Sequence, residues 1–297
     1  MPSDFTLRQI EYFEAAARLG SLSAAASACH TSQAGVSLSI ADLEKRIGVQ
    51  LFIRVKAKGV VLTEAGSRVL SDARRLLEAA DELQRDAHTM SDALQGTLTV
   101  GCYVTLAPFV IPPVLDDFAA LHPDLDVKII EGAGEEMRIA LIEGRCEVAF
   151  LYSDDSNTTL STTTVSTTKP YIILAADHPL AGQSEVSLSQ VAELPLIMFD
   201  VPSARNAAQM LRAQGLSPII RHVTQNIEVV RCLVARGLGY SILVQRWPVD
   251  ISYEGKPLVS LTIRDKTDDR KVILAWPEAS KPTRRAHALI AAAPELF

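Results

Sequence analysis

The spacing of apolar residues predicts three short helices in the first part of the chain. The first spans about residues 6–18, and Ser21 can cap a second that ends near Cys29. Ser32 can cap the third, whose apolar positions recur in steps of four, three and four. These positions are Val36, Ile40, Leu43 and Ile47. Such a pattern leaves the opposite side of the third helix free for another contact.

Two short apolar segments follow Phe52 and enclose a basic tip, which predicts a two-stranded wing. The basic residues are Arg54, Lys56 and Lys58. A helix-turn-helix with such a wing places its third helix in the major groove of DNA. Residues 1–62 are therefore predicted to form a winged helix-turn-helix DNA-binding domain.

A long helix is predicted from Thr63 to about residue 94, because apolar residues alternate there in steps of four and three. The repeat comprises Val69, Ala73, Leu76, Ala80, Leu83, Ala87, Met90 and Leu94. An amphipathic helix packed on its own domain is the alternative, but more than three clean heptads favour a coiled coil. We therefore expect residues 63–94 to form a linker that dimerises the protein.

From Gly96 onward, short apolar runs alternate with helical patterns, which is typical of a parallel α/β sheet. A polar, threonine-rich stretch over residues 153–169 interrupts the series, and a second set of strands and helices follows it. We expect two α/β lobes joined by crossing strands, with a ligand cleft between them. This effector-binding domain covers residues 95–297, with lobe 1 at about 95–163 and 264–297 and lobe 2 at about 164–263.

Composition restricts the class of protein. Of the 297 residues, 48% are hydrophobic and 22% are charged, as in soluble globular proteins. The chain lacks the pattern of a signal peptide and any apolar run long enough to span a bilayer. The four cysteines show no pairing pattern, so a reduced, cytoplasmic location is expected.

Charge is distributed unevenly. The net charge is −6, yet residues 1–62 hold seven Lys or Arg against five Asp or Glu, and the remainder holds 22 against 30. This asymmetry fits a small DNA-facing module attached to a body that DNA does not contact.

The chain resembles LysR-type transcriptional regulators over essentially its full length. The matching positions are Leu7-Arg8-Gln9, Phe13, Gly20-Ser21, Ala25-Ala26, Ser32-Gln33, Val36-Ser37, Ile40, Leu43-Glu44, Gly48, Leu51-Phe52, Arg54 and residues 62–66, with looser matches at Pro108, 118–123, Gly144 and 237–239. The resemblance implies a winged helix, a dimerising linker helix and a two-lobe effector domain like that of periplasmic binding proteins. It also implies assembly as a homodimer or homotetramer, and it makes RNA polymerase a candidate partner beside DNA and a small-molecule effector. Ala34 and Gly35 depart from the proline and alanine usual in the family, and Leu38 and Ala41 replace residues that are often basic or polar.

The expected DNA contacts lie at the start of the third helix and on the wing. Gln33 and Ser37 are expected to reach base edges, and Ala34 or Leu38 to touch thymine methyl groups. Arg54, Lys56 and Lys58 are expected to meet phosphates, although a solvated wing is the alternative. Thr31 and Ser32 are expected to cap the third helix, and contact with a DNA phosphate is the alternative role.

The resemblance also maps effector contacts onto loops and crossing strands. These residues are Tyr103, Val104, Thr105, Gly132, Ala133, Thr163, Val201, Pro202, Ser203, Thr224 and Gln225. The Thr105 hydroxyl and the amides of Ser203 and Ala204 could hold a carboxylate, with Arg205 nearby. The alternative is that Thr105 and Ser203 simply cap helices. Arg246 could also pair with an anionic effector, but a surface position is the favoured interpretation of this residue.

No catalytic or metal-binding pattern is present. The histidines and cysteines lack metal-ligand spacing, and there is no nucleophile elbow, phosphate loop or full dinucleotide fingerprint. We therefore predict no cofactor, no enzymatic activity and buried, inert cysteines. The favoured function is a sequence-specific DNA-binding transcriptional regulator that responds to an organic acid or an aromatic compound. The alternatives are a cytosolic solute-binding module with a vestigial DNA-binding head and, less favoured, an enzyme.

Overall fold

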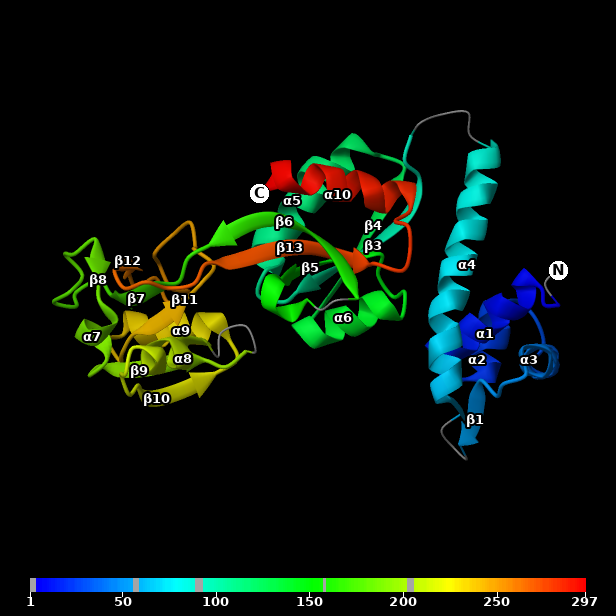
Figure 1. Ribbon diagram of the computed structural model, residues 1–297, viewed down its shortest axis with the longest axis horizontal. Coiled ribbons are helices and arrows are strands. Elements are labelled where there is room, and N and C mark those ends of the chain that lie inside the picture. Colours follow the sequence, from blue (N-terminus) through cyan, green and yellow to red (C-terminus); the bar gives the residue numbers. More distant parts are fainter. Residues whose placement is uncertain (1–3, 56–58, 89–92, 157–158, 202–205) are drawn as a thin grey trace.

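The computed structural model describes residues 4–55, 59–88, 93–156, 159–201 and 206–297. A small helical domain packs on one end of a long helix, and two α/β lobes extend away from that helix in line (Figure 1). The first lobe lies beside the helix, and the second lies farther out.

The N-terminal domain consists of α1 (Leu7–Leu19), α2 (Leu22–Ala28), α3 (Gln33–Ile47) and the hairpin of β1 (Phe52–Val55) and β2 (Gly59–Leu62). Ser21 and Ser32 cap α2 and α3 as predicted, by accepting bonds from the amides of Ala24 and Gly35. Phe13 and Phe52 pack edge to face in the core with ring centroids 5.4 Å apart. The local sequence therefore determines both the helix starts and the small core that joins them.

The linker α4 (Glu64–His88) is shorter than predicted. Thr63 caps it, because the amide of Gly66 donates to the Thr63 hydroxyl at 2.8 Å. Leu94, expected on the last turn, instead packs against the core of lobe 1. The predicted repeat also divides: Val69 and Ala73 pack on the N-terminal domain, while Leu76 and Leu83 are 39% and 71% exposed. Met90 and the side chain of Ala87 lie outside the described residues.

Lobe 1 contains a five-stranded sheet in the order β4-β3-β5-β13-β6. The strands are β3 (Gly96–Tyr103), β4 (Leu125–Gly132), β5 (Val148–Tyr152), β6 (Leu160–Thr168) and β13 (Arg270–Pro277). The helices are α5 (Ala107–Pro113), α6 (Gly134–Ile142) and α10 (Arg284–Leu296). The sheet is mixed and not wholly parallel, since β13 runs antiparallel to both β5 and β6.

Most of the threonine-rich stretch forms strand β6, as expected for a crossing strand near Thr163. Most of its side chains are polar, and β13 pairs with it along its length. Helical structure continues from α5 to Leu121, but its form changes after two prolines: α5 gives way to a π-helical turn (Val114–Phe118) and a 3₁₀ turn (Ala119–Leu121). Proline lacks an amide donor, so regular α-helical bonding is interrupted there.

Lobe 2 contains a four-stranded sheet in the order β11-β7-β12-β8 and a parallel pair of β9 and β10. The strands are β7 (Tyr171–Ala175), β8 (Glu185–Val186), β9 (Pro195–Phe199), β10 (Ile219–Thr224), β11 (Ser241–Leu243) and β12 (Leu258–Ile263). The helices are α7 (Leu188–Val191), α8 (Asn206–Ala213) and α9 (Ile227–Ala235). Strands β8 and β12 and helix α7 were not predicted. None of the helices in the described ranges is long and apolar enough to cross a bilayer.

Candidate DNA interface and interlobe cavity

Helix α3 buries one side and exposes the other. Val36, Ile40 and Leu43 are buried, whereas Ser32, Gln33 and Ala34 are exposed at the first turn. Leu38 is 72% exposed, a large apolar side chain left in solvent on the same helix. The predicted base-contacting residues thus share the free side of α3. Thr31 precedes the Ser32 cap and is half-buried.

The wing is joined to α3 through a side-chain contact. Arg54 Nη2 donates to Ser37 Oγ at 2.8 Å, so the predicted phosphate contact and a predicted base contact lie together. The wing rests on the turn between α1 and α2, where the Val60 amide donates to the Gly20 carbonyl at 3.0 Å. Gly59 has a φ of 84°, and a Cβ at this position would lie 2.2 Å from the Gly20 oxygen. Lys56 and Lys58 lie outside the described residues.

Carboxylates at two points of α3 fix its orientation. Glu44 Oε1 accepts bonds from the amides of Leu51 at 2.7 Å and Phe52 at 3.1 Å, where the chain enters β1. Asp42 accepts bonds from Gln9 at 2.8 Å and from Arg46 at 2.6 Å, and the Arg46 bond lowers the pKa of this carboxyl below its usual value. Gln9 and Glu44 are among the positions that match the LysR-type pattern, and these bonds show what their side chains do in the fold.

A cavity of about 640 Å³ lies between the two lobes. Of the predicted effector contacts, Val104, Thr105, Val201 and Gln225 line it. Lobe 1 supplies its Val104 and Thr105 from the segment that joins β3 to α5, and lobe 2 supplies Val201 and Gln225 from the ends of β9 and β10. Pro202, Ser203, Ala204 and Arg205 lie outside the described residues.

Five other predicted contacts do not line this cavity. Tyr103 is buried in lobe 1 against the Tyr152 ring, with centroids 5.5 Å apart. Gly132 and Ala133 lead into α6, where Glu136 already accepts the Ala133 amide at 2.9 Å. The remaining two are Thr163, which pairs with Leu274 on the edge strand β6, and Thr224, whose hydroxyl accepts the Asn226 amide at 3.2 Å.

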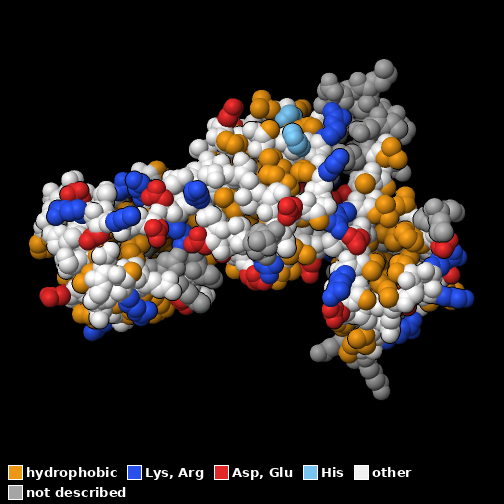
Figure 2. Space-filling model, viewed as in Figure 1, with side chains coloured by type: hydrophobic (Ala, Val, Ile, Leu, Met, Phe, Trp, Pro, Cys, Tyr) orange, Lys and Arg blue, Asp and Glu red, His pale blue; other side chains and the backbone are white. Residues whose placement is uncertain are grey.

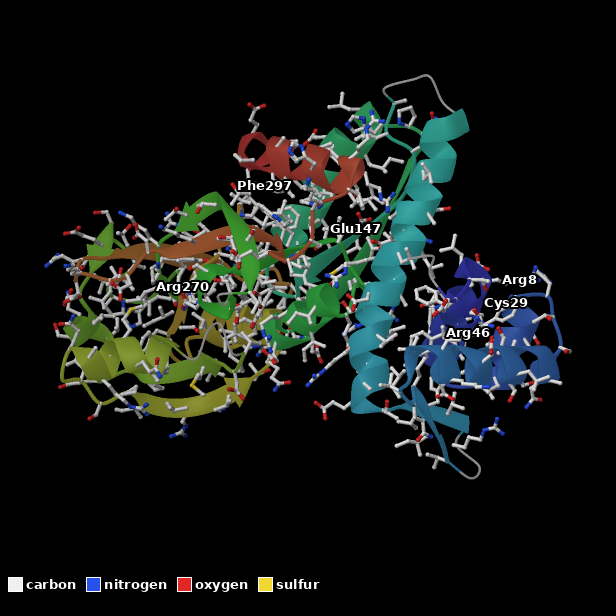
Figure 3. All side chains as sticks on the ribbon, turned by 45° about the vertical axis from the view of Figure 1, so that its right-hand side comes forward. Arg8, Cys29, Arg46, Glu147, Arg270 and Phe297 are labelled. Carbon is white, nitrogen blue, oxygen red and sulfur yellow. The ribbon has the colours of Figure 1, made fainter. Side chains whose placement is uncertain are left out.

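Two polar side chains at the cavity, Tyr152 and Arg270, were not singled out from the sequence. Gln245 also lines the cavity, directly after the strand that ends near Val244, where the sequence places an edge of the cleft. Thr105 Oγ1 donates to the Tyr152 hydroxyl at 3.5 Å, and Thr105 does not cap α5, so the capping interpretation of Thr105 is wrong. Burial raises the pKa of Tyr152 despite the neighbouring Thr105 and Gln245 side chains, which lower it. Arg270, labelled in Figure 3, is the first residue of β13, where the chain returns from lobe 2. Arg246 is exposed and lies over the Tyr171 ring.

An aromatic contact connects the lobes at the cavity. Phe109 of α5 meets Trp247 of lobe 2 edge to face, with centroids 5.3 Å apart. The guanidinium of Arg231 lies over the Trp247 ring, 4.8 Å from the ring centroid. Arg231 is buried and forms an ion pair with Glu228 at 2.9 Å. Trp247 is therefore held between an aromatic ring of lobe 1 and a buried charge of lobe 2.

The potential metal ligands and the cysteine thiols of the described residues bear on whether this protein could carry out metal or thiol chemistry. In the part of the chain that the structure describes, no group of three or more His, Cys, Asp or Glu could hold a metal ion. Burial raises the pKa of both Cys102 and Cys146 to about 12, so little of either thiol ionises near neutral pH. Cys29 and Cys232 are only half-buried, which does not fit the expectation that all four are buried.

A winged helix-turn-helix joined by a long helix to two lobes around a cavity defines a class: DNA-binding proteins with a ligand-binding domain. Comparison with known families agrees with this class. Residues 7–67 match the bacterial regulatory helix-turn-helix protein, lysR family, and residues 91–297 match the LysR substrate binding domain. The chain belongs to the LysR family of transcriptional regulators.

Individual relatives support the same assignment. HinK, a LysR family transcriptional regulator from Pseudomonas aeruginosa, is 30% identical, with 98% of each chain covered and a TM-score of 0.66. The C-terminal domain of a probable LysR family regulator from Rhodococcus sp. RHA1 is 35% identical over 67% of this chain and 99% of that chain, with a TM-score of 0.65. The regulator cbl of Klebsiella aerogenes is 29% identical over 236 residues, which cover 78% of this chain and 75% of the relative.

These relatives are transcriptional regulators and not solute-binding proteins. The chain is accordingly a DNA-binding transcriptional regulator with an effector-binding domain, and the alternative of a solute-binding module with a vestigial head is wrong.

Proposed function

We propose that this regulator is a cytoplasmic, non-enzymatic protein that binds operator DNA as a dimer and changes its DNA contacts when a small molecule enters the interlobe cavity. One observation carries the proposal: an exposed α3 with a wing and a cavity of about 640 Å³ belong to one chain and are connected through α4. Residues 1–62, 63–94 and 95–297 are the corresponding DNA-binding, linker and effector-binding units, with lobe 2 between about residues 164 and 263.

The DNA contacts follow from exposure and charge. Gln33 and Ser37 reach base edges, and Ala34 and Leu38 supply apolar contact with thymine methyl groups. Arg54, Lys56 and Lys58 contact phosphates, which position the protein without reading sequence. Ser32 and Thr31 approach a phosphate from the helix start.

The dimer is supported by the apolar side chains that α4 leaves uncovered. Leu76 and Leu83 are exposed on this helix, and Figure 2 shows hydrophobic side chains gathered over α4 and the adjoining N-terminal domain. A second α4 would cover them. Contacts between effector-binding domains would then make a tetramer of two such dimers, and RNA polymerase is the further partner of a regulator bound beside a promoter.

Communication between cavity and DNA requires a mechanical connection, which α4 supplies. Ser71 Oγ donates to the Ile142 carbonyl, and Arg74 Nη1 donates to the Glu143 carbonyl at 2.8 Å, so α4 holds the end of α6 in lobe 1. Arg74 Nε also meets Glu14 of α1 at 3.5 Å. A ligand with different affinities for two lobe arrangements would therefore alter how the DNA-binding domains are spaced.

The test is a footprint of the purified protein on the DNA upstream of its own gene, with and without small carboxylates and aromatic compounds. We expect a protected site whose pattern changes with one compound. Gln33→Ala should weaken operator binding more than binding to unrelated DNA, whereas Arg54→Gln should weaken both and reduce the salt dependence. Absence of protection at low salt would contradict the proposal, and steady turnover of a compound would contradict its non-enzymatic part.

A further inference from the structure

The interlobe cavity contains a buried cation with incomplete pairing. Arg270 is only 7% exposed and lines the cavity. Its Nη1 lies 3.1 Å from Asp154 Oδ2, but the Asp154 side chain is 57% exposed. Burial raises the pKa of the half-buried Asp155 carboxyl, and an electrostatic interaction with Arg270 opposes this larger effect. Its Nε is buried and has no hydrogen-bond partner among the described residues. A buried guanidinium is unfavourable unless its donors are used, so this arrangement favours an anion at the remaining donor.

A second buried donor lies at the same wall. Gln245 Nε2 has no hydrogen-bond partner of regular geometry within the described part of the chain, although the Gln245 side chain acts on the Tyr152 hydroxyl and opposes the rise in its pKa that burial causes. Tyr152 connects the two groups: the Arg270 guanidinium lies 5.2 Å from its ring centroid, and Gln245 lies near its hydroxyl. Amide and guanidinium groups both present N–H donors here, so the complementary ligand group is one that only accepts, such as a carboxylate.

The rest of the cavity determines the body of the ligand. Phe109 and Trp247 form an aromatic wall, and Phe199, Val201, Met210 and Ile242 add apolar surface. The cavity lining also includes three charged residues that are exposed: Lys266, Asp268 and Asp269. Solvent screens these charges, so the two aspartates neutralise the buried charge of Arg270 only weakly. The cavity thus has one buried charged group and a mainly apolar lining, to which uncharged polar side chains such as Gln209, Gln225 and Asn226 also contribute.

We infer that the effector is a monocarboxylate on an aromatic or branched apolar body, with its carboxylate against Arg270 and Gln245. This inference rests on the proposed function, because it assigns the ligand of the same cavity. Arg270 pairs with Thr168 at the point where β13 and β6 leave lobe 1, and the Thr168 hydroxyl donates to the Arg270 carbonyl at 3.3 Å. The ligand charge therefore acts directly on the strands that connect the two lobes.

Isothermal titration of the full-length protein with matched acids and amides tests the inference. The probes are benzoate, phenylacetate and 4-methylpentanoate, each beside its neutral amide. We expect at least one acid to bind about tenfold or more tightly than its amide, the difference that one charge-assisted hydrogen bond supports. Arg270→Gln should remove this preference, while Arg270→Lys should keep part of it.

Asp154→Asn distinguishes ligand binding from a structural role for Arg270. Removal of the competing carboxylate should make acids bind several-fold more tightly, whereas loss of a merely structural ion pair would weaken every probe. Arg246→Gln is the matched control, because Arg246 is exposed on the Tyr171 ring and does not line the cavity. All variants are checked by circular dichroism.

Equal binding of acids and amides, or no binding of either at millimolar concentration, would overturn the inference. So would an Arg270→Gln variant that keeps the acid preference. A wild-type footprint obtained without any acid separates the two conclusions: if protection persists while the acids fail, the regulator stands and only the carboxylate assignment falls.

Discussion

The exposed side of α3 comes from one continuous stretch between Thr31 and Leu38, whereas the interlobe cavity draws its lining from segments between Val104 and Arg270. The DNA-binding face is therefore a property of a single capped helix and its wing. The cavity exists only after two lobes and their crossing strands have folded. Local interactions suffice for the first site, and long-range packing is required for the second.

The polar interactions of the two regions differ in the same way. In the N-terminal domain, Glu44 and Asp42 accept bonds at the ends of neighbouring elements, and both groups remain near solvent. In lobe 2, Arg231 is almost completely buried and donates to the carbonyls of Val249 and Ile251 as well as pairing with Glu228. We therefore expect single substitutions to have their largest effects in the effector-binding domain.

Replacement of Arg231 is the strongest test of this comparison. Arg231→Ala leaves Glu228 buried without its partner and frees two carbonyl groups, so lobe 2 should lose about 3–5 kcal/mol of unfolding free energy. Urea unfolding followed by tryptophan fluorescence measures this loss, because Trp247 lies on the Arg231 guanidinium.

The control removes an exposed ion pair of the same lobe. Arg264 lies 2.8 Å from Glu185, and both side chains are about half exposed. Arg264→Ala should change stability by at most about 1 kcal/mol. If the two variants unfolded at the same urea concentration, burial of Arg231 would not explain the stability of lobe 2.

A smaller effect is expected where α4 meets the N-terminal domain. Gly66 is buried, and a Cβ at this position would lie 2.1 Å from the Leu51 carbonyl oxygen. Gly66→Ala should therefore destabilise the N-terminal domain by about 1–3 kcal/mol through displacement of α4. Hydrogen exchange of the α1 and α3 amides would report this loss domain by domain. Gly182→Ala has no atom within 4 Å of its added carbon and should change stability by less than about 0.5 kcal/mol.

The sequence predicts the elements whose signals are local. The serine caps, the apolar steps of α3 and most strands of both lobes follow from spacing alone. A crossing strand near Thr163 is expected, but the sequence does not set the extent of β6, because most of its side chains are polar and its pairing with β13 defines it. Leu94 continues the apolar repeat of the linker helix in the sequence, yet it lies outside α4 and packs against the core of lobe 1.

The cavity shows the same limit more sharply. Thr105 and Gln225 follow strands directly and could be anticipated, but Arg270 reads in the sequence as a charge at the edge of an apolar strand. Its burial depends on Asp154 and Tyr152, which precede it by more than a hundred positions. No local pattern contains that information. The sequence therefore pointed to Arg246, which the structure leaves exposed.

The smallest predicted change tests whether Ser32 does more than cap a helix. Ser32 Oγ accepts the Gly35 amide at 3.1 Å, so Ser32→Ala should lower stability by about 1 kcal/mol. Aspartate also caps helices well but carries a negative charge, so Ser32→Asp should keep the stability and lose operator affinity if a phosphate lies against this residue. Thermal unfolding and DNA titration at several salt concentrations measure both quantities. Ser21→Asp, at the cap of α2, controls for the added charge. If both aspartate variants bound DNA equally well, Ser32 would be a cap alone, and its side chain would play no direct part in DNA contact.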